Sequence, residues 1–294
     1  MLVLDDPALN QRLPMATAIE WVRDAIREAF EGRLLSPPRA SAQLGDSRLT
    51  FTCGRVPGRA VGYRSYLAPG DHGDDQVVVV QDDGGRVRAI HVGQALGPLR
   101  TGAIGGVALD ALAPARVDSL AVIGSGTQAW QQLVAASCVR TWRQVRVYSP
   151  SAEHRVALAA RACALGLPAT SAASARTAVE GVDVVILATS SPTPVIDTAW
   201  VAAASLVTTL GPKQQGRHEF GLDLVAASAS VVTDSPDQLF GYDPPNVLVA
   251  TPQAERVVHL GAVLAGAPVR HPTLFCSVGL AGTEMYLLAR LVGL

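Results

Sequence analysis

The chain has 294 residues, of which 49% are hydrophobic and 17% are charged, and its formal net charge is −1. This composition suits one or two packed cores and excludes an intrinsically disordered chain. The balanced charge and the aromatic content of 5% also argue against nucleic acid as a partner, because such surfaces are basic and stack bases on aromatic rings.

The N-terminal third predicts one amphipathic helix followed by an antiparallel sheet. Apolar residues recur at helical spacing from Ile19 to Phe30, Thr17 and Glu20 are spaced as a capping box, and Gly32 is placed to end the helix. Strand-like segments follow, with the last two joined by the turn DDGG: SRLTFTCG, AVGYRSYLAP, QVVVVQ and RVRAIHV. A glycine-rich helix is expected over GQALGPLRTGAIGGVALDALA.

From Asp118 onward, strands alternate with helices, which predicts a doubly wound parallel sheet. Helices are expected from about Gln128 and about Ala152, between the strand-like segments SLAVIG, QVRVYS, VDVVILAT, SLVTTLG and SVVTDS. After about Pro272, the segment LFCSVGLAGTEMYLLARLVGL predicts one more helix, which we expect to fold back onto the first domain.

The cysteines and the N-terminus are typical of a soluble cytoplasmic protein. The four cysteines are scattered without a CxxC pair, so we expect neither a metal site nor a disulfide framework. The first ten residues lack the basic and then apolar pattern of a signal peptide. No run of about 18 apolar residues occurs, so no membrane partner is expected.

The segment LAVIGSGTQAW places Gly124-x-Gly126-x-x-Ala129 directly after a strand and at the start of a helix. Gly124 permits a tight turn, Gly126 lets the backbone approach a pyrophosphate, and Ala129 allows close helix packing. The helix N-terminus then offers N–H groups and a partial positive charge to the phosphates. The motif therefore predicts dinucleotide binding; the alternative is a chance glycine turn.

The end of the second strand of this domain bears on the choice between NAD and NADP. An acidic residue about 20 residues past the motif would bind the ribose 2′-hydroxyl of NAD. No Asp or Glu stands at Tyr148 or Ser149, whereas Ser149, Ser151 and Arg155 suit a 2′-phosphate. We therefore favour NADP(H) over NAD(H). The alternative is that these residues only begin the next helix, with Ser151 as its cap.

The order of six segments along nearly the whole chain resembles the ornithine cyclodeaminase/mu-crystallin family: SPPRA, VGYRSY, LRTGA, VIGSGTQA, LGPKQQGRHEF and LFCSVGLA. The resemblance implies a homodimer in which a doubly wound Rossmann domain is inserted into a mixed α+β substrate-binding and dimerisation domain. We place the Rossmann domain at 114–271 and the other domain at 1–113 with 272–294. The expected fold class is thus α/β.

The resemblance also implies a small substrate that bears a carboxylate and is held by cations. Arg39 and Arg100 match two of these cations; the alternative is that both are ordinary surface arginines. Thr101 would lie near the cofactor phosphates, and Ser190 and Ser277 near the nicotinamide. The full set of expected cofactor-binding residues is Thr101, Gly124, Ser125, Gly126, Thr127, Gln128, Ser149, Ser151, Arg155, Ala188, Ser190, Gly211 and Ser277.

Two residues depart from the family pattern. Arg64 stands where the family usually has a lysine, and Lys213, the only lysine of the chain, stands where it often has an aspartate. A charged lysine repels a substrate ammonium, so ornithine cyclisation is disfavoured. Arginine holds anions but donates protons poorly, whereas lysine can donate a proton. We therefore expect Arg64 to bind the substrate, and we name Lys213 and Arg64 as the catalytic candidates.

Two functions are compatible with these residues. In the first, the protein uses NAD(P)H to reduce a C=N bond next to a carboxylate in a small amino-acid-like substrate, and Lys213 or a water supplies the proton. In the second, catalysis is lost and the protein binds a small molecule with NADP. An amino-acid dehydrogenase or cyclodeaminase of the same family is a further alternative.

Other polar residues carry weaker expectations. His72, His91 and His218 are candidate acids or bases, although none lies in a decisive motif. Glu219 adjoins a position that is typically charged in the family, with a surface location as the alternative. Glu284 lies near an acid of the family's last helix, where it would either orient the nicotinamide loop or cap exposed structure.

Overall fold

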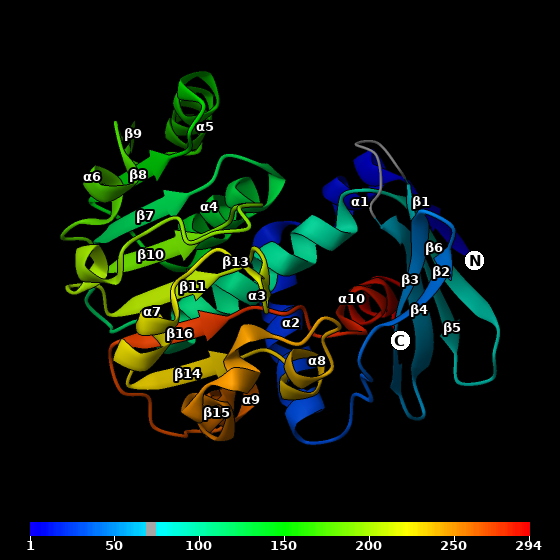
Figure 1. Ribbon diagram of the computed structural model, residues 1–294. Helices are drawn as coiled ribbons and strands as arrows, with labels where there is room; N and C mark the ends of the chain where they lie inside the picture. The colour runs from blue at the N-terminus through cyan, green and yellow to red at the C-terminus, as the bar shows by residue number, and fades with distance from the viewer. Residues whose placement is uncertain (69–74) are drawn as a thin grey trace. The chain divides into compact units, whose positions relative to one another are not determined.

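The computed structural model describes residues 1–68 and 75–294, which form two compact units (Figure 1). The first unit comprises Met1–Ile104 with Gly279–Leu294, and the second comprises Gly105–Val278. Helix α3 (Leu96–Leu112) begins in the first unit and ends in the second. Over the described ranges, no helix is both long and apolar enough to cross a membrane.

The first unit is built on a six-stranded sheet in the order β1-β6-β5-β4-β3-β2. The neighbours pair antiparallel, except that β1 runs parallel to β6. Its elements are β1 (Leu2–Leu4), α1 (Asp6–Arg12), α2 (Met15–Phe30), β2 (Ala40–Leu44), β3 (Ser47–Val56), β4 (Ala60–Ala68), β5 (Gln76–Asp82), β6 (Val87–Gly93) and α10 (Thr283–Leu291).

One face of this sheet is covered by helix α10. Alternate residues of β3 from Thr50 to Val56 are buried, as expected for a strand with one face against a core. Two glycines let the helix approach closely: a Cβ at Gly54 would lie 2.6 Å from the Cα of Gly282, and a Cβ at Gly62 would lie 2.4 Å from the Cγ of Met285.

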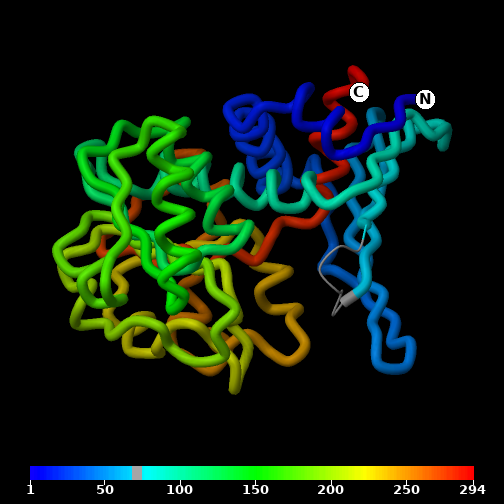
Figure 2. Tube along the Cα trace, turned by 90° about the horizontal axis from the view of Figure 1, so that it is seen from above, coloured from blue at the N-terminus to red at the C-terminus, as the bar shows by residue number. Residues whose placement is uncertain are grey.

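Helix α2 lies alongside α10, so the two ends of the chain meet in the same unit (Figure 2). Tyr286 donates a hydrogen bond to Glu28 over 3.1 Å, and Arg290 pairs with Asp24 over 2.7 Å. The predicted capping box was wrong, because the N-cap of α2 is Pro14, three residues before Thr17, and it provides no side-chain cap.

The second unit is an eight-stranded sheet in the order β15-β14-β16-β11-β10-β7-β8-β9, in which all neighbours are parallel (Figure 1). This confirms the predicted doubly wound sheet. Its strands are β7 (Ser119–Ile123), β8 (Gln144–Tyr148), β9 (Ala169–Ser171), β10 (Val184–Leu187), β11 (Leu206–Thr209), β14 (Ser230–Thr233), β15 (Val257–His259) and β16 (Thr273–Cys276).

Helices and short turns connect these strands. The α-helices are α4 (Thr127–Val139), α5 (Ala152–Ala164), α6 (Ala175–Val179), α7 (Leu222–Ala227), α8 (Pro236–Phe240) and α9 (Leu260–Leu264). The 3-10 helices are η1 (Thr198–Val201), η2 (Val247–Ala250) and η3 (Pro252–Arg256), and β12 (Lys213–Gln214) with β13 (Arg217–His218) forms a small hairpin.

The prediction of one helix after Pro272 was wrong in its first part. The segment Thr273–Cys276 is strand β16, which is fully buried between β11 and β14. A short apolar run has the same hydrophobic pattern in a buried strand as in a buried helix, so pairing with two neighbours decides its structure. Only Thr283–Leu291 is helical, after Gly279 and Gly282 with φ angles of 80° and 77°.

Candidate functional site

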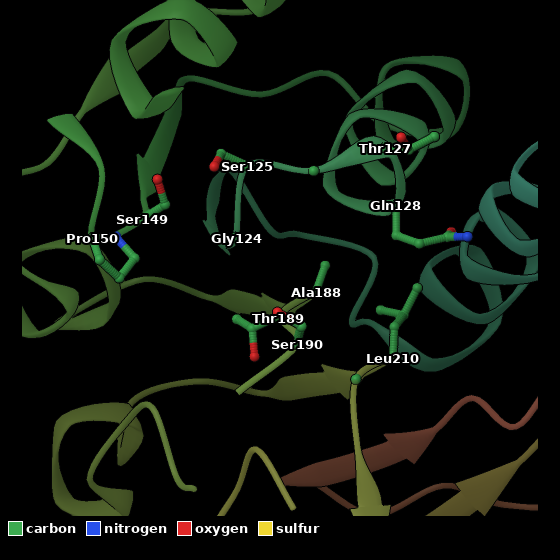
Figure 3. Close-up of a pocket in the computed structure, with 12 residues that line it drawn as sticks. Gly124, Ser125, Thr127, Gln128, Ser149, Pro150, Ala188, Thr189, Ser190 and Leu210 are labelled. Atoms are coloured by element: carbon green, nitrogen blue, oxygen red, sulfur yellow. The ribbon is translucent and has the colours of Figure 1, made fainter. Parts of the chain in front are cut away.

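A pocket of about 400 Å³ lies in the second unit, at the carboxyl ends of its central strands (Figure 3). The register places Ile123 of β7 beside Tyr148 of β8 and Leu187 of β10, and Leu187 beside Thr209 of β11. The loops that follow these four strands therefore meet at one edge of the sheet. The residues that line the pocket are Gly124, Ser125, Gly126, Thr127, Gln128, Ser149, Pro150, Ala188, Thr189, Ser190, Leu210 and Gly211.

The lack of a side chain has a different structural consequence at each of the two motif glycines. Gly124 has a φ of 123°, and a Cβ there would lie 2.2 Å from the carbonyl oxygen of Ala188. A Cβ on Gly126 would point into open space, with no atom within 4 Å among the described residues. Gly124 is therefore required by the fold, whereas Gly126 leaves room for a ligand.

Helix α4 begins at this pocket. Its N-cap residue is Gly126, which provides no side chain to cap the first turn, and the first turn carries no acidic residue. The N–H groups of this turn and the positive end of the helix dipole are thus available to an anion beside Thr127 and Gln128. These features fit the pyrophosphate of a dinucleotide.

The loop after β8 forms another part of the pocket. Ser149 and Pro150 line it, and the guanidinium of Arg155 donates to their carbonyl oxygens over 3.1 and 3.3 Å. Ser151 caps helix α5 by accepting a hydrogen bond from the backbone N–H of His154. The cap that the sequence named as the alternative role for Ser151 is therefore present.

The structure gathers most, but not all, of the predicted cofactor residues. The predicted residues that lie outside the set lining the pocket are Thr101, Ser151, Arg155 and Ser277. Thr101 belongs to the first unit, where its hydroxyl donates to the carbonyl of Gly97. Sequence reasoning missed Pro150, Thr189 and Leu210, although each directly adjoins a predicted residue after a strand.

Lys213 is only 2% exposed and comes two residues after Gly211, which lines the pocket. Its ammonium donates to the carbonyl oxygens of Gly211 and Leu210 over 2.6 and 3.2 Å. Lys213 also affects Cys276 of strand β16. Burial raises the pKa of Cys276 to about 12, whereas the positive charge of Lys213 acts to lower this pKa. Lys213 is thus not a surface residue.

The first unit contains a buried cluster of Arg64, Arg100 and Glu284, which we call the arginine cluster. The Nη1 of Arg64 donates to Oε1 of Glu284 over 2.6 Å. The Nε and Nη2 of Arg100 donate to the same oxygen over 2.8 and 2.6 Å. All three side chains are at most 10% exposed, so neither arginine is an ordinary surface residue.

The charges of the arginine cluster do not cancel. Burial acts to raise the pKa of Glu284, but the charges of Arg100 and Arg64 and the hydrogen bond from Arg100 lower it to about 2. The ionised carboxylate therefore balances one of the two guanidinium charges, so the three side chains together carry a charge of about +1. Arg64 also packs on the ring of Tyr66, 4.3 Å from its centroid.

Arg39 directly precedes strand β2, the edge strand beside β3, and its side chain is of intermediate exposure. Arg64 belongs to β4, on the other side of β3.

The remaining candidates are explained by local contacts. His91 is buried and contacts Asp6 through Nε2 over 3.0 Å; burial lowers its pKa, and Asp6 acts in the opposite direction. The Nδ1 of His218 contacts the carbonyl oxygen of Phe220 over 2.6 Å. His72 lies outside the described residues.

The profile of the ornithine cyclodeaminase/mu-crystallin family matches residues 73–292. The chain belongs to this family. The match extends from the sheet of the first unit through the whole second unit to helix α10.

Two curated relatives share parts of this sequence. The NAD(P)H-dependent anabolic L-arginine dehydrogenase of Pseudomonas aeruginosa is 38% identical over 44% of this chain and 40% of its own length. The iminosuccinate reductase of Paracoccus denitrificans is 32% identical over 65% of this chain and 59% of its own length. The matched segments thus span about half the length of these two relatives.

The fold agrees with that of a solved family structure. The crystal structure of the iminosuccinate reductase of Paracoccus denitrificans in complex with NAD+ matches with a TM-score of 0.88. The match covers 99% of this chain and 95% of the other at 24% identity. This likeness confirms the predicted fold class.

We predict that alanine at one motif glycine lowers stability, whereas alanine at the other weakens binding. Gly124→Ala should lower the free energy of unfolding by about 2 kcal/mol or more, because the methyl group meets the Ala188 carbonyl and the φ angle is strained. Gly126→Ala should leave stability almost unchanged but weaken dinucleotide binding, because its methyl group enters the pocket. Urea unfolding and fluorescence titration with NADPH measure the two effects; equal destabilisation by both variants would contradict this assignment.

We also predict that Glu284 makes stability depend on pH in the acid range. Its pKa is lowered from 4.5 to about 2, so its stabilising effect is complete above pH 4.5 and is lost as the pH falls toward 2. Glu284→Gln should cost about 3 kcal/mol at pH 7, and this difference should shrink in acid. The control Glu180→Gln breaks an exposed pair with Arg176 and should cost about 0.5 kcal/mol or less. Urea unfolding at pH 7, 5 and 3 would contradict the prediction if the Glu284→Gln difference stayed constant.

Proposed function

We propose that the protein is an NAD(P)H-dependent reductase of a C=N bond next to a carboxylate in a small amino-acid-like substrate. The observation that carries the proposal is the arginine cluster, which keeps a net positive charge buried in a chain that also has a dinucleotide pocket. Such a cluster suits an anionic group, and a guanidinium can bind a carboxylate in two-point geometry.

The relatives support this substrate class. One is named an L-arginine dehydrogenase and the other an iminosuccinate reductase. Both names refer to small molecules that pair a carboxylate with a carbon–nitrogen function, which is the combination proposed for this chain. The proposal therefore specifies the bond and its neighbouring acid group and leaves the rest of the substrate undefined.

The chain's own residues would bind and orient the substrate. Among the described residues, the Nε of Arg64 is buried without a hydrogen-bond partner, so it is a donor for a substrate carboxylate oxygen. Glu284 holds the guanidinium groups of Arg64 and Arg100 in place before the substrate arrives. When bound, a reduced nicotinamide supplies the hydride that converts the C=N bond to C–N. The proton completes the amine, and Lys213 as its donor stays a prediction of the sequence.

NADP(H) is our proposed cofactor in preference to NAD(H). No carboxylate stands between Tyr148 at the end of β8 and Ser151 at the start of α5, so an acidic ligand for a ribose 2′-hydroxyl is missing at this place. The nearby guanidinium of Arg155 is anchored on the carbonyls of Ser149 and Pro150. A fixed cation at this loop supports binding of a 2′-phosphate.

We further propose that the protein forms a homodimer through the outer face of the six-stranded sheet. The strand register places a set of exposed apolar side chains on the face opposite helix α10. These residues are Val3, Leu44, Phe51, Tyr63, Leu67 and Val92. A second copy would bury this surface. A cytoplasmic location stays a prediction of the sequence.

The reductase is tested by following NADPH oxidation with a panel of cyclic imines and of 2-oxo acids mixed with amines. We expect turnover of imines that carry a carboxylate on the imine carbon, and kcat/KM lower by about tenfold or more for the same ring without the carboxylate. NADH in place of NADPH should give a lower kcat/KM. Binding of cofactor and carboxylate without turnover would instead support the binding protein, and conversion of ornithine to proline with ammonia would show cyclodeamination.

The dimer is tested by a charge on the exposed sheet face. Phe51→Asp should convert a dimer into a monomer in light-scattering measurements, because a carboxylate would have to lose its hydration in the interface. The matched control Val156→Asp places the same charge at an exposed apolar position on helix α5 and should leave the dimer intact. A monomeric wild type, or a Phe51→Asp dimer of unchanged affinity, would refute the proposed interface.

A further inference from the structure

Glu219 is a completely buried carboxylate that follows the small hairpin of β12 and β13. The surface location considered for it from the sequence is therefore wrong. Its Oε2 accepts from the backbone N–H and the hydroxyl of Thr189 over 3.0 and 2.7 Å. Its Oε1 accepts from the hydroxyl of Thr209 and the N–H of Gly211, each over 2.6 Å. Four donors thus satisfy one buried charge.

Three of these donors belong to the two loops that form one wall of the pocket, and the fourth, the hydroxyl of Thr209, lies at the end of strand β11. Thr189 follows strand β10 and Gly211 follows strand β11, and both residues line the pocket. Each oxygen of Glu219 holds one loop, so the carboxylate sets the distance between them. The fit is tight at Gly211, where a Cβ would lie 2.3 Å from the carbonyl oxygen of Thr189 and 2.4 Å from Oε2 of Glu219.

Lys213 binds the backbone carbonyl groups of the loop that follows strand β11. The N–H of Gly211 donates to Glu219, while the carbonyl oxygen of Gly211 accepts from the ammonium of Lys213 over 2.6 Å. A second bond from Lys213 reaches the carbonyl of Leu210. Both backbone groups of Gly211 are thus fixed by buried side chains of opposite charge. Charge-assisted hydrogen bonds of this kind are stronger than neutral ones.

We propose that Glu219 and Lys213 are positioning residues for the dinucleotide pocket, acting through Thr189 and Gly211. This inference rests on the proposed nicotinamide-nucleotide site but not on the identity of the substrate. In this role the ammonium of Lys213, the only lysine of the chain, binds the carbonyl oxygens of Leu210 and Gly211, and we call this pair of contacts the clamp. Removing either charge should therefore disturb the wall of the pocket and weaken cofactor binding without direct loss of a cofactor contact.

The experiment measures the Kd of NADPH by fluorescence titration, together with thermal stability, in wild type and variants. Glu219→Gln keeps the shape but presents an amide NH2 to one pair of donors, so we expect the Kd to rise by about tenfold or more. The matched control is Asp183→Asn at the opposite end of β10, where one oxygen of Asp183 accepts from the N–H of Asp118 and from the N–H and hydroxyl of Ser119. This control should lower stability and leave the Kd unchanged.

The outcomes separate positioning from a general structural role. If Glu219→Gln and Asp183→Asn lower the melting temperature and both leave the Kd of NADPH unchanged, the proposal fails while the proposed function stands. If wild type binds neither NADPH nor NADH, both fail. Should Glu219→Gln not fold, Thr209→Val removes the hydroxyl donor of a buried residue outside the pocket lining, with little change in shape, and should still raise the Kd; an unchanged Kd would overturn the proposal.

Lys213→Met distinguishes the clamp from a proton donor. As a positioning residue, Lys213 should change cofactor binding in the same direction as Glu219, so Lys213→Met should raise the Kd of NADPH. If Lys213 were instead the proton donor, its loss would lower kcat and remove one limb of the pH profile of kcat, while the Kd stayed at its wild-type value. That second result would overturn the proposed role of Lys213.

Discussion

The parallel pairing of β7, β10 and β11 is the constraint on which the dinucleotide pocket depends. Ile123, Leu187 and Thr209 stand in one row, so the loops that follow them leave the sheet side by side. Gly124 then packs against the carbonyl of Ala188, which leaves no space for a side chain between the two loops. The open space in front of Gly126 and the uncapped start of helix α4 follow from that arrangement. Ligands of open α/β sheets bind at this edge because helix N-termini and flexible loops gather there.

Buried charges organise each unit in a different way. In the first unit, Glu284 is shared by two guanidinium groups, and the excess positive charge suits an incoming carboxylate. In the second, Glu219 has no salt-bridge partner among the described residues and is held by hydroxyl and backbone donors. Desolvation makes an unpaired charge costly, so both carboxylates are surrounded by donors. The arginine cluster keeps an excess positive charge for a ligand, whereas Glu219 fixes the positions of two loops of the pocket.

Local patterns in the sequence predicted the strands, the doubly wound sheet and the glycine-rich turn. The motif from Gly124 to Ala129 is readable because its requirements lie within six residues. Strand β16 was mistaken for part of a helix, because the pairing partners that make it a strand are distant in sequence. The burial of Glu219 was also missed, since a glutamate beside two other polar residues has the same local pattern on a surface as in a core.

The sequence by itself determined the two kinds of sheet and the turn that can hold a dinucleotide, because these depend on periodicity and on residues close together in the chain. The order of six short segments resembled the family to which the chain belongs. Only the tertiary structure decided which charges meet. Arg64 and Glu284 are 220 positions apart, and nothing local links them. The partners of Glu219 and Lys213 likewise depend on which loops become neighbours when the strands pair. Burial then makes these contacts strong, because a charge removed from water must find its donors or acceptors within the protein.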